Sequence, residues 1–171
     1  QALGHIDVLF NNAGVGYFAL MEEATGENIR HLFEVNTFAP LSLIQALLPQ
    51  MIRRGGGRII NIVSCAGRVP IPTVGVYGGS KSALAVMTNT MRLELEPKGV
   101  EIINVYPGTL DTAFEENALR EEDRPGLCPK DKCGDPRFYI AKKVIDAAVG
   151  PPGEVWLERQ GKWFSTAALF M

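Results

Sequence analysis

Apolar residues along the chain gather in short continuous runs, separated by longer stretches in which they recur at helical spacing. The short runs are Ile6–Phe10, Arg58–Val63 and Val100–Tyr106, with a fourth and weaker run at Glu154–Glu158. Continuous apolar runs of this length are typical of strands that are buried on both faces. The sequence therefore predicts four short strands.

The longer stretches carry apolar residues three or four positions apart, which predicts amphipathic helices. The expected helices cover about Thr25–Arg53, Tyr77–Glu96 and Arg137–Val149, with Thr25 as a candidate N-cap of the first. Strands that alternate with helices in this way indicate an α/β fold. In such a fold a parallel sheet is covered by helices on both faces.

Unusual residues follow three of the predicted strands. Asn11–Gly14 follows the first strand, Ser64 the second and Pro107–Gly108 the third. Ligands of open parallel sheets bind beyond the carboxyl ends of the strands, and parallel strands bring these ends to one rim. Each segment alone also fits a plain turn, but together they predict a binding site at this rim.

The bulk properties agree with one globular domain and exclude some kinds of partner. The chain has 171 residues, of which 46% are hydrophobic and 21% charged, and we treat residues 1–171 as a single domain. A net charge of −2 gives no reason to expect binding to nucleic acid or to an anionic membrane. No apolar run approaches the roughly 20 residues that a membrane-spanning helix needs, so no transmembrane segment is expected.

The three cysteines are Cys65, Cys128 and Cys133, an odd and sparse set that makes a poor disulfide framework. Cys128 and Cys133 could close a local bridge or supply half of a metal site. No second cluster of Cys or His is present to complete a zinc tetrahedron, so no metal is expected. We interpret the cysteines as free thiols in a reducing compartment, which favours a cytoplasmic location.

Tyr77 and Lys81 are candidates for proton chemistry. Their spacing of four residues places them on one face of the predicted helix. Most such pairs are simply exposed polar residues. However, an ammonium beside a phenol lowers the phenol's pKa from its ordinary value of ~10, which suits the phenol to acid/base catalysis. A hydroxyl such as that of Ser64 could then hold a substrate oxygen beside the phenol.

Asn36 lies inside a predicted helix, four residues before Pro40. Because proline has no N–H, the Asn36 carbonyl loses its usual helix partner and a kink is expected. A carbonyl freed in this way can hold a water molecule. The alternative is an asparagine that is merely tolerated beside a proline kink.

Five segments occur in an order that resembles the short-chain dehydrogenase/reductase superfamily. They are "IDVLFNNAG", the Asn of "EVNTF", "IINIVSCAG", "YGGSK" and "YPGTLDT", and Ser64 lies thirteen residues before Tyr77. The resemblance spans nearly the whole chain. It implies the carboxyl-terminal part of a Rossmann-like, doubly wound parallel sheet, with three to four parallel strands and flanking helices.

The resemblance also implies a role for individual residues. Tyr77 would be the catalytic acid/base, and Lys81 would lower its pKa and bind the nicotinamide ribose. Ser64 would orient the substrate oxygen, and Asn36 would hold a water molecule behind the lysine. The implied cofactor-binding residues are Asn11, Ala13, Gly14, Tyr77, Lys81, Pro107, Gly108, Leu110 and Thr112.

The implied activity is hydride transfer between NAD(P)(H) and a secondary alcohol or ketone, with NADP favoured over NAD. Residues 109–136 would form a substrate lid. A medium-sized substrate such as a steroid, retinoid or acyl ketone is expected, and the family further implies a homodimer or homotetramer. The expected apolar lining comes from Val69, Ile71, Val74 and Val76.

The chain departs from the family in one respect. The family's amino-terminal pattern T-G-x-x-x-G-x-G, which holds the pyrophosphate, is absent, and so are the residues that select NAD or NADP. We expect an incomplete form in which the amino-terminal strands are absent and Ile6–Phe10 is an exposed sheet edge. The alternatives are a non-catalytic fragment or scaffold on the same fold, or an epimerase or dehydratase of the extended branch. The segments Asn11–Gly14 and Pro107–Thr112 argue against the latter.

Overall fold

The computed structural model describes residues 4–109, 112–121 and 137–157. Four parallel strands form one sheet in the order β1-β3-β4-β6, and β2 pairs with β5 in a second, two-stranded sheet. The predicted α/β fold with a parallel sheet is therefore confirmed. The strands are β1 (Val8–Asn11), β2 (Tyr17–Phe18), β3 (Gly57–Ile62), β4 (Val100–Tyr106), β5 (Leu119–Arg120) and β6 (Gly153–Trp156).

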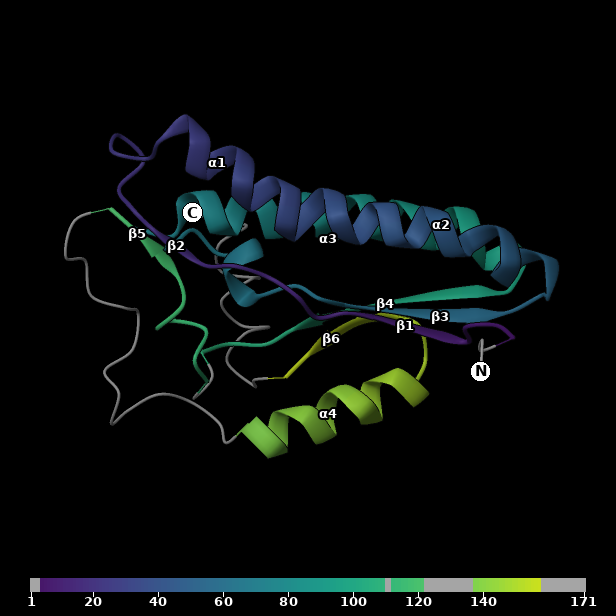
Figure 1. Cartoon of the computed structure of the whole chain (residues 1–171). Coiled ribbons are helices and arrows are strands. Elements are labelled where there is room, and N and C mark those ends of the chain that lie inside the picture. The colour runs from purple at the N-terminus through teal and green to yellow at the C-terminus, as the bar shows by residue number, and fades with distance from the viewer. Residues whose placement is uncertain (1–3, 110–111, 122–136, 158–171) are drawn as a thin grey trace.

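Helices cover both faces of the main sheet (Figure 1). On one face lie α1, α2 and α3, and on the other lies α4. Thr25 is the N-cap of α1, since its hydroxyl accepts a hydrogen bond from the Asn28 N–H at 3.2 Å. The helices are α1 (Gly26–Phe33), α2 (Ala39–Arg53), α3 (Gly75–Leu95) and α4 (Arg137–Val149), with short 3₁₀ turns at Cys65–Gly67 and Glu96–Lys98.

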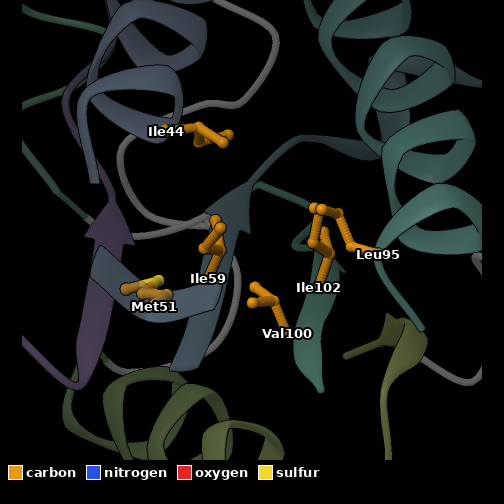
Figure 2. Close-up of a cluster of buried hydrophobic side chains, with 6 residues drawn as sticks. All are labelled: Ile44, Met51, Ile59, Leu95, Val100 and Ile102. Carbon is orange, nitrogen blue, oxygen red and sulfur yellow. The ribbon is translucent and has the colours of Figure 1, made fainter. Parts of the chain in front are cut away.

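Alternate residues of the central strands point to opposite faces of the sheet and build two cores. Ile59 and Ile102 are paired across β3 and β4 and contribute to a cluster with Ile44, Met51, Leu95 and Val100 (Figure 2). Their neighbours Ile60 and Ile103 pack on the other face against Ala147 and Ala148 of α4. This two-sided burial explains why the strands are continuous apolar runs in the sequence.

A turn of π-helix, Glu34–Phe38, joins α1 to α2. It ends two residues before Pro40, where the missing N–H was expected to produce a kink. The wider π turn changes the hydrogen-bonding step from i−4 to i−5, as in the bond from the Ala39 N–H to the Glu34 carbonyl. The helix axis therefore continues past the proline. The same turn carries Asn36 and Thr37, both buried, toward α3.

The continuous helical stretch Gly26–Arg53 is long and apolar enough to cross a membrane by length and composition alone. It does not stand out in the sequence as an apolar run, because polar residues interrupt it. The core helix of a soluble protein passes the same test. Here the stretch packs on the sheet and α3 through buried Leu32, Ile44 and Met51.

A row of polar side chains crosses the main sheet at one register position. Asn11, Asn61, Asn104 and Glu154 are Cα partners across β1, β3, β4 and β6. The Asn11 amide donates to the Asn61 carbonyl oxygen at 2.8 Å, and the Asn61 amide donates to that of Asn104 at 2.9 Å. Asn89 of α3 then connects Asn104 to Glu154, at 3.1 and 2.7 Å.

Strand β1 forms one edge of the described sheet. Its side chains Val8 and Phe10 are exposed, and so is Ile6 just before it. At the same edge, the Oδ1 atom of Asn11 is buried without a hydrogen-bond partner among the described residues. The exposed apolar edge expected at Ile6–Phe10 is thus present in the structure.

Candidate active site

A cavity of about 550 Å³ opens at the carboxyl ends of the strands. Asn12–Gly14 after β1, Ser64 after β3 and Pro107–Gly108 after β4 all line it, as expected for a parallel sheet. Tyr77 and Lys81, from the first turns of α3, line the same cavity. Segments that are far apart in the sequence therefore converge on one space of the size typical of ligand sites.

Tyr77 faces the cavity beside Ser64. Burial raises the pKa of the Tyr77 phenol to about 12, a hydrogen bond with the Ser64 side chain acts to lower it, and Cys65 acts to raise it. The net shift is opposite in direction to the one expected from the sequence. Ser64, rather than Lys81, supplies the lowering interaction in this structure. The phenol is therefore protonated at neutral pH.

Lys81 is only 3% exposed, and burial lowers its pKa from 10.5 to about 8. Its ammonium donates to the carbonyl oxygen of Ile62, the last residue of β3, at 2.9 Å. Gly14 makes room for it, because a Cβ at that position would lie 3.1 Å from both Lys81 Nζ and Asn36 Oδ1. The lysine is thus held between the ends of β1 and β3.

Ser64 begins the tight turn Cys65–Gly67, and its hydroxyl oxygen accepts from the Ala66 N–H at 3.2 Å. The turn packs directly on the backbone of α3. A Cβ on Gly78 would lie 2.5 Å from the Ala66 carbonyl oxygen, so only glycine allows this approach. Because Gly78 follows Tyr77, this contact holds the turn that begins at Ser64 against the helix turn that carries Tyr77.

Asn36 is fully buried and does not line the cavity. Its side chain pairs with the backbone of Val15: Oδ1 accepts from the Val15 N–H at 2.9 Å, and Nδ2 donates to the Val15 carbonyl at 2.9 Å. Nδ2 also donates to the Ser80 hydroxyl at 3.1 Å, which in turn donates to the Tyr77 carbonyl at 2.7 Å. Asn36 therefore links the segment after β1 to the first turn of α3.

The side wall of the cavity is formed by β2, which pairs with β5, and by Thr112, Phe114 and Glu115 before β5. The ring of Phe114 packs against that of Tyr77 with the centroids 5.5 Å apart. The wall is fastened by the Tyr17 hydroxyl, which donates to Glu121 at 2.5 Å, and by Asn28, which donates to the same carboxylate at 2.9 Å. Phe18, Ile71 and Val74 complete an apolar side of the cavity.

Most of the residues expected at the site line the cavity. Asn11 does not, since it belongs to the polar row inside the sheet, and Asn36 stands behind the cavity. Of the four expected apolar residues, Ile71 and Val74 line the cavity, while Val69 and Val76 do not. Leu110 and most of the expected lid, at 110–111 and 122–136, lie outside the described residues. The expected site residues that do line the cavity are Ala13, Gly14, Ser64, Tyr77, Lys81, Pro107, Gly108 and Thr112.

Several described lining residues were not singled out for the site from the sequence, among them Gly16, Tyr17 and Phe18. Asn12 and Phe114 also line the cavity, and they fall inside the expected rim segment Asn11–Gly14 and the expected lid at 109–136. Phe18 lies outside any periodic pattern, so no local signal pointed to it.

Within the described ranges, no group of three or more His, Cys, Asp or Glu side chains could hold a metal ion. Cys65 lines the cavity. Cys128 and Cys133 lie outside the described residues, so their pairing stays a prediction.

Comparison with known proteins links this geometry to one family. The family model described as short chain dehydrogenase matches residues 1–123. Dehydrogenase/reductase SDR family member 7B of Mus musculus is 33% identical over 149 residues, which cover 86% of this chain and 46% of that protein. The chain spans about half the length of the first curated relatives that it matches.

Solved structures give the same result. A short chain dehydrogenase from Burkholderia cenocepacia, in complex with NADP, is 31% identical with a TM-score of 0.79, covering 95% of this chain and 63% of that one. An alcohol dehydrogenase from the archaeon Thermococcus sibiricus, complexed with 5-hydroxy-NADP, is 29% identical with a TM-score of 0.75, covering 91% and 63%.

Proposed function

Because this chain belongs to the short chain dehydrogenase family, we propose that it carries the catalytic centre of an NAD(P)-dependent oxidoreductase. The reaction is hydride transfer between a nicotinamide cofactor and a secondary alcohol or ketone. The observation that supports it most strongly is the convergence of Ser64, Tyr77 and Lys81 on one cavity at the carboxyl rim of the sheet.

The residues at the rim fit the nicotinamide end of such a cofactor. Gly14 leaves the space that a Cβ would fill beside Lys81 Nζ, and Pro107–Gly108 forms the opposite side of the cavity. Ala13, Gly14, Lys81, Pro107, Gly108 and Thr112 would hold the cofactor there. When bound, it supplies or accepts the hydride.

Tyr77 is the proton donor in the reducing direction. Its phenol, with a pKa of about 12, carries its proton at neutral pH and can pass it to the substrate oxygen as negative charge develops there. Ser64 hydrogen-bonds with the same phenol, so a substrate oxygen placed between the two hydroxyls meets two donors. In the oxidising direction the phenol must first lose its proton, and the Tyr77 phenolate then accepts the proton of the substrate hydroxyl while Ser64 keeps the substrate oxygen in place.

Lys81 assists from behind the phenol. With a pKa of about 8 its ammonium is mostly charged at neutral pH, and a positive charge near Tyr77 stabilises the phenolate that proton transfer leaves behind. Asn36 fixes the position of both, because it links Val15 to the helix turn that carries Tyr77. A water-mediated relay through Asn36 is part of the proposal.

The substrate class follows from the two sides of the cavity. Ser64 and Tyr77 recognise one oxygen, whereas Phe18, Ile71, Val74 and Phe114 offer only apolar contact. We therefore propose a medium-sized ketone or secondary alcohol with an apolar body. NADP as the preferred cofactor, a homodimer or homotetramer and a cytoplasmic location complete the proposal.

The test compares the wild-type chain with Tyr77→Phe. Cofactor binding is followed by nicotinamide fluorescence with NADPH and NADH, and turnover is measured with a panel of aliphatic and cyclic ketones. We expect Tyr77→Phe to lose turnover by roughly 10²–10⁴-fold, because the general acid is removed. Cofactor affinity should change little.

Tyr139→Phe is the matched control, since it removes another phenol hydroxyl that lies outside the cavity lining. It should retain turnover. Wild-type protein that is folded and binds cofactor but turns over no ketone would refute the oxidoreductase proposal and favour a binding or scaffold role.

A further inference from the structure

We propose that Arg68 and Glu154 are positioning residues for the Ser64–Tyr77 pair. They form an ion pair outside the cavity that fixes the turn carrying Ser64 to the two strands beside it. This inference rests on the function proposed above, because it assigns these side chains a part in the same proton transfer. Neither residue lines the cavity around Ser64 and Tyr77.

The turn that carries Ser64 is anchored at both ends. At its start, Ser64 caps the 3₁₀ turn Cys65–Gly67, and the Gly67 N–H donates back to the Ser64 carbonyl at 3.0 Å. At its end, the Arg68 N–H donates to the Cys65 carbonyl at 2.9 Å. The direction of the Ser64 side chain therefore depends on where Arg68 is held.

Arg68 is held by its side chain. One guanidinium nitrogen donates both to the Tyr106 hydroxyl, at 3.1 Å, and to the Glu154 carboxylate, and the guanidinium lies 5.3 Å from the centre of the Tyr106 ring. The Tyr106 ring is itself stacked on that of Trp156, with the centroids 4.5 Å apart. The arginine thus bridges the turn after β3 to both β4 and β6.

Glu154 is the centre of this cluster. Its Oε1 atom accepts from Asn89 at 2.7 Å, from Tyr106 at 2.8 Å and from Arg68. Burial acts to raise the pKa of Glu154, but these hydrogen bonds and the charge of Arg68 hold it below its ordinary value. The carboxylate is therefore charged at neutral pH, which makes each of its hydrogen bonds stronger than a neutral one.

The cluster also reaches the opposite side of the cavity. Tyr106 directly precedes Pro107, whose carbonyl accepts from the Cys65 N–H at 3.0 Å, and the Cys65 thiol lies 3.7 Å from the Tyr106 carbonyl. The serine turn and the Pro107–Gly108 turn are thus tied to each other and to one ion pair. Loosening that pair should let Ser64 move relative to Tyr77.

The variants Arg68→Met and Glu154→Gln remove the ion pair, and Arg68→Lys restores a cation. Arg58→Met is the matched control. Arg58 also forms a partly buried pair across β3 and β4, with Glu101, and it also donates to two backbone carbonyls. However, Arg58 lies at the amino end of β3, away from the cavity.

The first readout needs neither cofactor nor substrate. Fluorotyrosine is incorporated, the ¹⁹F signal of position 77 is assigned with Tyr77→Phe, and its chemical shift is compared among the folded variants. Because the turn that begins at Ser64 packs on α3 next to Tyr77, we expect the signal to shift in Arg68→Met and Glu154→Gln. Arg68→Lys should restore part of the effect.

The second readout is ketone turnover. We expect kcat to fall roughly tenfold to a hundredfold in Arg68→Met with little change in KM, because misplacement of a catalytic group slows the chemical step more than it weakens binding. An unchanged ¹⁹F signal in both cluster variants, or an equal change in Arg58→Met, would overturn the inference. If even the wild type turns over no ketone, the proposed function fails, and the ¹⁹F comparison alone still decides whether the ion pair positions Ser64 against Tyr77.

Discussion

Tyr77 and Lys81 lie in one cavity, and burial moves their pKa values in opposite directions. The pKa of the phenol rises to about 12 and that of the ammonium falls to about 8, because burial disfavours whichever form is charged. The sequence alone showed that these residues share a helix face. It could not show the sign of the shift for Tyr77, since that sign depends on how deeply the neighbouring loops bury the hydroxyl.

The buried charge of Lys81 should make stability depend on pH. Its pKa is about 8 in the folded chain against an ordinary value of 10.5, so between these pH values the unfolded chain binds the extra proton. Stability due to this group therefore rises from pH 8 to pH 10.5. At pH 7 the Lys81→Met variant no longer buries a charge, which should raise its stability. We expect this gain to offset part or all of the cost of losing the hydrogen bond from Lys81 to the Ile62 carbonyl.

The measurement is urea unfolding of both proteins at several pH values. The difference in unfolding free energy between Lys81→Met and wild type should shift in favour of wild type by up to about 3 kcal/mol across this range. The raised pKa of Tyr106 acts equally in both proteins and cancels, and a Tyr77→Phe background for both removes the phenol whose charged form Lys81 would stabilise. Lys98→Met is the control, because Lys98 is exposed. A difference that stays constant with pH would contradict the buried-charge account.

Among the elements, the two-residue strand β2 connects two parts of the cavity wall. On one side it pairs with β5, and on the other the Ala19 N–H just after it donates to the Thr73 carbonyl at 2.8 Å. Thr73 adopts φ of 69°, a left-handed conformation that is costly for a β-branched residue. The loop that carries Ile71 and Val74 into the cavity wall is thus held in a strained conformation.

Thr73→Asn should relieve that strain. Asparagine tolerates the left-handed region, so we expect the variant to be more stable by about 1 kcal/mol. Thermal and urea unfolding would measure the change. Thr90→Asn serves as the control, because Thr90 is exposed within α3 and the two residues have similar helix propensities. Equal effects at the two positions would show that left-handed strain at Thr73 is not the cause.

The long elements could be predicted from the sequence, and the short ones could not. Val100–Tyr106 and Arg137–Val149 have the predicted bounds, and the other strands and helices differ by a few residues at their ends. The pair β2–β5 was missed because two residues carry no periodicity. The π turn was anticipated only as a kink, since a missing N–H at Pro40 shows that the α-helical bonding must change but not how it changes.

The sheet as a unit is tied together by its polar row. The sequence contains a signal for this row, because "RIINIV" and "EIINVY" both place an Asn after two isoleucines. Parallel pairing aligns the two motifs residue by residue, so Asn61 meets Asn104. The link onward to Asn89 and Glu154 could not be predicted, because it depends on how α3 sits over the sheet.

Asn61 is the central member of this row, and Asn61→Leu should be strongly destabilising. The leucine leaves the Asn11 amide and the Asn104 oxygen each without its bond to Asn61, at a cost of about 2–4 kcal/mol in unfolding free energy. The triple variant with Leu at positions 11, 61 and 104 should cost less than three such single changes, because it removes the unpaired groups. Strict additivity in urea unfolding would show that the row is not cooperative.

The alignment of the row also has a consequence for how such a sheet can change over generations. Because side chains alternate between the faces of a strand, inserting or deleting one residue upstream within β3 or β4 would turn its asparagine toward α4 and place an isoleucine or a valine in the row. An apolar substitution at another position of these strands can keep the row intact, whereas a change of strand length cannot. Related proteins should therefore differ in the identity of some residues in β3 and β4 but keep the same number of residues in each strand.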